Sequence, residues 1–136
     1  MTLSVGRLFA AAALLGLAGC SGGSIANGRA IFESGKDSDG VQIVAQPPPP
    51  LYGRCAACHG ANGAGGVRFP DGAVSADLRH AALSEGAHPY TLPLLERAIS
   101  TGIDNDGKPL DPVMPRWQLS QRDLNNVAEY VLTQLR

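Results

Sequence analysis

The chain has 136 residues and a formal net charge of −1, so it is long enough for one compact domain and carries no basic excess for binding nucleic acid. Aromatic residues make up only 5% of the chain, whereas 17 glycines and 10 prolines are present. These proportions predict long loops around a small side-chain core, to which a bound prosthetic group could add apolar volume.

The first predicted feature is an export signal. Residues 8–18 form an apolar run after the single early charge of Arg7. A helix needs about 20 residues to cross a bilayer, so this run fits the apolar centre of a cleaved signal better than an uncleaved anchor helix.

The four residues at positions 17–20, L-A-G-C, resemble the lipobox of bacterial lipoproteins, in which the cysteine is lipidated and the signal is cut just before it. The resemblance implies a signal peptide over residues 1–19, a lipidated tether over residues 20–24 and a lipid anchor on Cys20. It also implies a place in the bacterial cell envelope, facing the periplasm, with Ser21 slightly favouring the outer membrane over the inner membrane. The alternative is plain cleavage, which gives a free periplasmic protein.

The predicted domain covers residues 25–136 and begins with a helix over residues 25–33, for which Ser24 is a suitable N-cap. An insertion over residues 34–51 follows this helix. It contains an aspartate-glycine turn and an extended stretch, and its four prolines at 47–50 are expected to form a stiff polyproline II spacer.

Two cysteines and a histidine stand together in Cys55-Ala56-Ala57-Cys58-His59. Secretion exposes thiols to an oxidising compartment, so both cysteines are expected to be chemically occupied. Zinc needs about four ligands, and this segment offers three at most. A thioredoxin-like redox pair belongs to a βαβ pattern, which the sequence does not show. The remaining interpretation is C-x-x-C-H, the attachment motif of a c-type haem, in which Cys55 and Cys58 bind the vinyl groups and His59 is the proximal iron ligand.

A short helix is expected after Cys55, and residues 60–66 are predicted to form a glycine-rich loop. A further helix is predicted over residues 92–101, which Thr91 can cap and Gly102 can end. The helix side chains expected to face the haem or the core are Leu95, Ala98 and Ile99.

Residues 35–43 and residues 102–110 share the pattern G-x-D-x-D-G-x-x-apolar. Calcium binding is one interpretation, but neither stretch has the downstream glutamate of an EF-hand, so turn formation by Asp, Asn and Gly is favoured. Both turns are expected to lead into short extended segments, at 41–44 and 108–110, that pair as a two-stranded ladder beside the haem.

The sixth iron ligand has three candidates. Met114 is the single methionine left after removal of the signal, and it lies between two prolines rather than on an amphipathic face. His80 and His88 are its rivals, although the simpler interpretation of each is an exposed, titrating side chain.

The last helix is predicted over residues 121–135, with Ser120 at its start and an apolar stripe along one side. The haem motif, the Met-Pro pair at Met114 and this helix together resemble the class I c-type cytochromes, over most of the mature chain. In that family the Met-Pro pair presents its thioether to the iron, and the first helix crosses the last at a glycine flanked by aromatic residues. The residues that match this crossing are Gly28, Phe32, Val127 and Tyr130.

The resemblance implies an all-α class I cytochrome c fold around one covalently attached haem c, with His59 and Met114 as iron ligands. It implies an electron carrier rather than an enzyme, with redox proteins as partners, a membrane anchor and no small-molecule substrate. One alternative is a haem sensor or peroxidase-like enzyme in which Met114 leaves the iron. Another is a cytochrome subunit of a larger oxidoreductase, docked through the 34–51 insertion.

The haem propionates also need hydrogen-bond donors. Trp117, three residues after the candidate ligand Met114, is the favoured one. The further candidates are Arg54, Arg68, Arg79, Tyr90 and Arg116.

Overall fold

The computed structural model describes residues 24–50 and 53–136. The predicted signal peptide, the lipid anchor at Cys20 and most of the tether lie outside the described residues. Within them, none of the helices is long and apolar enough to cross a membrane.

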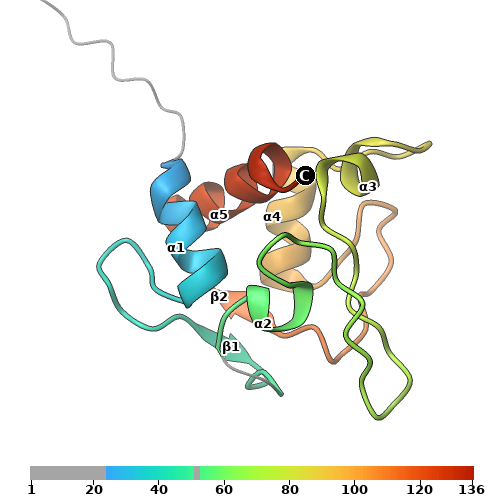
Figure 1. Ribbon diagram of the computed structural model, residues 1–136, viewed down its shortest axis with the longest axis horizontal. Helices are drawn as coiled ribbons and strands as arrows, with labels where there is room; N and C mark the ends of the chain where they lie inside the picture. The colour runs from blue at the N-terminus through green and yellow to red at the C-terminus, as the bar shows by residue number, and fades with distance from the viewer. Residues whose placement is uncertain (1–23, 51–52) are drawn as a thin grey trace, which may run out of the picture.

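Helices make up most of the regular structure (Figure 1). In chain order they are α1 (Ile25–Ser34), α2 (Ala56–His59), α3 (His80–Ser84), α4 (Leu92–Thr101) and α5 (Gln121–Gln134). Two short strands complete the fold, β1 (Val44–Gln46) and β2 (Arg116–Gln118). The predicted helices α1, α2, α4 and α5 are confirmed, whereas α3 was not predicted.

Local signals at the helix ends explain most of these boundaries. The Ser24 side chain accepts a hydrogen bond from the Asn27 amide at the start of α1, and Ser120 accepts one from the Asp123 amide at the start of α5. Gly102 ends α4 in the left-handed conformation, with φ of 71°. The predicted cap of α4 is only half right, because Thr91 holds the N-cap position but its side chain makes no capping hydrogen bond.

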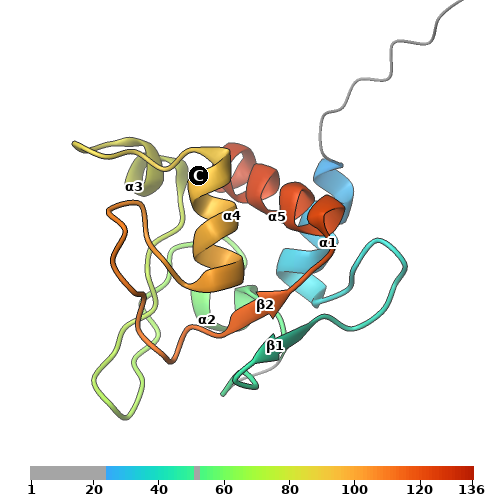
Figure 2. The ribbon, with the colours of Figure 1, turned by 180° about the vertical axis from the view of Figure 1, so that it is seen from behind.

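The first and last helices cross at Gly28, as the family resemblance implied (Figure 2). A Cβ atom on Gly28 would lie 2.1 Å from the Asn126 carbonyl oxygen and 2.7 Å from Cβ of Tyr130. Beside this contact, the rings of Phe32 and Tyr130 lie 5.7 Å apart in a tilted arrangement. The crossing therefore places α1 and α5 in backbone contact, with Phe32 fully buried beside them.

The two-stranded ladder exists, but its predicted pairing is wrong. β1 pairs antiparallel with β2, with Ala45 opposite Trp117, and not with residues 108–110. Residues 108–110 instead return to the end of α4, where the Leu110 amide donates to the Gly102 carbonyl at 2.8 Å. Residues 108–110 are therefore bonded back to the end of α4 rather than to the strand β1.

The two aspartate-glycine turns have the same hydrogen bonds, which confirms turn formation. In the first turn, Oδ1 of Asp37 accepts from the amides of Asp39 and Val41. Oδ1 of Asp104 accepts from the amides two and four residues further on in the same way. These carboxylates are occupied by their own backbone, and the described residues contain no group of three acidic, histidine or cysteine side chains that could hold a metal ion.

Candidate cofactor-binding site

A cavity of about 290 Å³ lies at the centre of the fold, and most of its walls are apolar. All five helices and strand β2 contribute to its lining, together with loop residues between 69 and 90 and between 110 and 115. The predicted attachment and ligand residues Cys55, Cys58, His59 and Met114 meet in this lining. The predicted inward-facing side chains of α4 also line it, which confirms that prediction, as do two candidate propionate donors: Leu95, Ala98, Ile99, Tyr90 and Trp117. An apolar cavity with a few convergent polar or ligating groups is typical of a cofactor site.

Helix α2 fixes the spacing of the C-x-x-C-H segment. Cys55 holds its N-cap position and His59 is its last residue, and the His59 amide donates to the Cys55 carbonyl at 3.0 Å. Both thiols line the cavity, and neither forms a disulfide. Burial raises the pKa of Cys55 to about 12 and also raises the pKa of Cys58. A dithiol redox centre needs a lowered pKa, so this pair does not have the character of a thioredoxin-like site.

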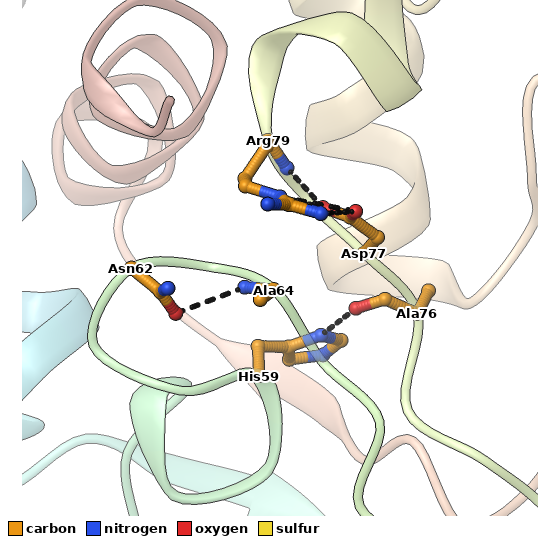
Figure 3. A network of polar contacts seen from close by, with 6 residues as sticks. All are labelled: His59, Asn62, Ala64, Ala76, Asp77 and Arg79. Carbon is orange, nitrogen blue, oxygen red and sulfur yellow. Dashed lines mark hydrogen bonds and ion pairs between the residues drawn. The ribbon is translucent and has the colours of Figure 1, made fainter.

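His59 is buried, with 7% of its surface exposed, and its orientation is fixed by a backbone carbonyl. Nδ1 lies 2.8 Å from the Ala76 oxygen, toward which Figure 3 shows the ring turned. Because a carbonyl oxygen only accepts, Nδ1 carries the proton and Nε2 keeps its lone pair. Burial lowers the pKa of His59, and the Ala76 hydrogen bond only partly opposes this. The side chain is therefore a neutral imidazole, the form that binds a metal.

The segment that carries Ala76 is held against α2 by a hairpin that sequence analysis missed. Oγ of Ser75 donates to the Cys58 carbonyl at 2.7 Å and accepts from the Val67 amide at 2.9 Å. At its base, a Cβ on Gly65 would lie 2.3 Å from the Ala76 oxygen, so this close approach requires glycine. The glycine-rich loop at 60–66 was the signal that could have indicated this packing.

The tip of the hairpin has the same pair of backbone hydrogen bonds as the two aspartate turns, with Phe69 in place of the first aspartate and without its carboxylate bonds. The Phe69 amide donates to the Ala73 carbonyl, and the Gly72 amide donates to the Phe69 carbonyl. Phe69 and Val74 both line the cavity. A third copy of the same turn thus supplies apolar wall rather than polar surface.

Of the three candidates for a second axial ligand, the cavity lining includes Met114 but neither His80 nor His88. Nδ1 of His80 is bonded to the Leu132 carbonyl at 3.0 Å. The His88 side chain is 70% exposed, and its Nδ1 lies 2.5 Å from Asp106. The two histidines therefore have other partners, away from the cavity.

The predicted propionate donors are distributed unevenly. Trp117, 3% exposed, and Tyr90 line the cavity, whereas Arg54, Arg68, Arg79 and Arg116 do not. Arg79 is instead paired with Asp77, and this pairing lowers the pKa of Asp77 to about 2.

Arg97, which sequence analysis did not name, does not line the cavity, and its Nη2 donates to the Asp104 carbonyl. Its Nε is buried with no hydrogen-bond partner among the described residues, and its charge acts on the nearby Tyr90 hydroxyl.

Two thiols, a neutral imidazole and a thioether around one apolar cavity form a donor set that fits a covalently attached haem. Comparison with protein families also indicates a protein with covalently attached haem. The cytochrome c family model matches residues 25–134, so the chain belongs to the cytochrome c family, whose members carry electrons on covalently attached haem c. Searches of curated proteins and of solved structures give no match.

Proposed function

We propose that the protein is a lipid-anchored electron carrier, in which Cys55 and Cys58 hold one haem c through thioether bonds. His59 and Met114 are the two axial ligands in this proposal. The observation that carries it is that all four side chains line a single apolar cavity, while the two rival histidines lie outside it. The family membership of the chain supports the same cofactor.

The bound haem supplies one-electron chemistry, and the chain supplies the ligands and the environment. The Ala76 carbonyl orients the His59 ring and makes it a better donor. The apolar walls exclude water, which with a thioether ligand favours a high reduction potential. With both axial positions filled by the protein, no position remains for a substrate, and this favours a carrier over an enzyme.

The lipobox-like segment supports attachment to a membrane through Cys20, on the periplasmic side of the bacterial envelope and with the outer membrane slightly favoured. Helix α1 begins at Ile25, so only a short tether separates the lipid from the domain. An anchored carrier exchanges electrons with redox proteins at the membrane surface rather than by long diffusion. Within the 34–51 insertion, Val41 and Val44 are more than half exposed and are available for such contacts.

The ligand set is tested by absorption spectra of the haem-loaded protein, oxidised and reduced, out to the near infrared. Wild-type protein is expected to show the weak near-infrared band of a ferric His/Met haem and to resist carbon monoxide when reduced. Met114→Ala is expected to lose the band and to bind carbon monoxide readily. His80→Ala and His88→Ala are matched controls that should keep the wild-type spectrum. Wild-type protein that lacks the band, or loses it in a histidine variant, would contradict the proposed ligand set.

A further inference from the structure

Arg116 is bonded across the loop that carries Met114. Its Nη2 donates to the Leu110 carbonyl at 3.1 Å. Its Nη1 donates to the Met114 carbonyl and, at 3.4 Å, approaches the Asp111 carbonyl. One guanidinium group therefore contacts the backbone at both ends of the 110–114 segment.

The same guanidinium lies against the end of α4. A Cβ atom on Gly102 would stand 1.9 Å from Nε of Arg116 and 2.1 Å from Cζ, so the side chain occupies the space that glycine leaves open. The Leu110 amide is bonded to the Gly102 carbonyl in the same place. Because Leu95, Ala98 and Ile99 of α4 line the cavity, Arg116 connects the Met114 loop to a wall of the site.

The other side of Arg116 is equally fixed. Its backbone opens β2 and is paired with Gln46 of β1, and the next residue, Trp117, is buried in the core. Strand pairing and the buried neighbour thus hold the backbone of Arg116 in place, which limits where its guanidinium group can lie. Hydrogen bonds from a charged group are about twice as strong as neutral ones, and the planar fork of arginine loses little freedom in making several at once.

We propose that Arg116 is a positioning residue that keeps Met114 on the iron; this inference rests on the proposed His/Met ligation. Release of Met114 requires the 110–114 loop to open, and opening breaks the Arg116 bonds to the loop carbonyls. Arg116 therefore sets the population of the state in which the iron lacks its methionine ligand, without touching the haem itself.

The test is competition by imidazole for the ferric, haem-loaded protein. Imidazole binds only after Met114 has left, so its apparent affinity is the intrinsic affinity multiplied by the open fraction. Arg116→Gln is expected to raise the apparent affinity about tenfold, the change expected when a charge-assisted hydrogen bond is lost. Arg116→Lys, which keeps the charge but not the fork, is expected to give a smaller rise.

Two control variants distinguish failure of the proposed Met114 ligation from failure of the proposed role of Arg116. Arg122→Gln removes a different arginine, which contacts Ser38 and Asp39, and should leave imidazole affinity unchanged. Met114→Ala gives the affinity of a permanently open site. If Met114→Ala binds imidazole no better than wild type, the proposed ligation fails.

If Met114→Ala binds tighter while Arg116→Gln and Arg116→Lys match Arg122→Gln, the ligation stands and the positioning role of Arg116 is overturned. If Arg116→Gln fails to fold, the imidazole affinity of Arg116→Lys, compared with that of Arg122→Gln, decides the question instead. A purely structural role would lower the denaturation midpoint of the variants but leave their imidazole affinity at the wild-type value.

Discussion

Asp123 joins the start of α5 to the first aspartate turn. It is 5% exposed, and its carboxylate accepts from Oγ of Ser120 at 2.6 Å and from the Ser38 amide at 3.3 Å. Burial acts to raise the pKa of Asp123, but the hydrogen bonds from Ser120 and Ser38 outweigh it and hold the pKa below the ordinary 3.8. A carboxyl with a lowered folded-state pKa stabilises the fold at every pH above its unfolded-state value.

Asp123→Asn is therefore expected to change how stability depends on acid. In the wild type, the contribution of Asp123 is complete above about pH 4 and is lost as the pH falls through its lowered folded-state pKa. The asparagine variant should be less stable at pH 7, and the difference should shrink in acid. Denaturant unfolding of the haem-loaded proteins between pH 7 and pH 3 measures this. Parallel stability curves over that range would contradict it.

His59 shows what the sequence can and cannot predict about a single residue. Its place in C-x-x-C-H predicts an iron ligand, because the spacing itself carries the chemistry. The partner that orients its ring is the carbonyl of Ala76, and no side chain type identifies a backbone oxygen in advance. Arg116 is similar, since the sequence made it only one of several candidate propionate donors, whereas its bonds go to loop carbonyls.

At the scale of elements, the crossing of α1 and α5 depends on Gly28. An exposed glycine in a helix costs about 1 kcal/mol relative to alanine, so replacement by alanine would normally stabilise the protein. Here the new methyl group would lie 2.1 Å from a backbone oxygen, which cannot move without separating the helices. Gly28→Ala is therefore expected to destabilise the protein by about 2 kcal/mol or more, as overpacking does.

The measurement is denaturant unfolding of the haem-loaded protein, with Ala26→Gly as the control on the exposed side of the same helix. The control should follow helix propensity and, because Ala26 lies in the first turn of α1, lose at most about 1 kcal/mol. A Gly28→Ala variant as stable as wild type would mean that the helices do not touch at this position in solution.

The turns explain why the ladder was predicted with the wrong partner. The sequence correctly indicated a repeated turn after α1 and after α4, because its signal of Asp, Asn and Gly is local. Strand pairing depends on which segments the packed helices bring together, and residues 108–110 are drawn back to α4. The third turn, at Phe69, lacks the first aspartate of the other two but keeps Asp71 and Gly72, so a local Pro-Asp-Gly turn signal is present there as well.

For the whole molecule, the long helices, the C-x-x-C-H motif and the α4 side of the cavity were predictable, whereas the rest of the cavity wall was not. Helix caps and apolar stripes are local patterns, and C-x-x-C-H is a compact motif. The cavity wall also depends on a hairpin at 66–75 and on helix α3, which are placed by long-range contacts with α2 and α5. The site therefore combines a few residues that local patterns predict with walls that form only when distant segments pack together.

The proposed lipid anchor concerns the whole molecule, and Cys20→Ala tests it. The folded domain begins at α1, and Cys20 lies outside the described residues, so the change should leave the haem spectrum and the unfolding midpoint as in the wild type. Two or three acyl chains bind a membrane stably, so the wild type should sediment with membranes and take up labelled fatty acid. The variant should take up no label and appear in the soluble fraction or remain as an unprocessed precursor. Ser21→Ala is the matched control and should stay labelled. A Cys20→Ala protein that still takes up label would show that the lipid is attached elsewhere.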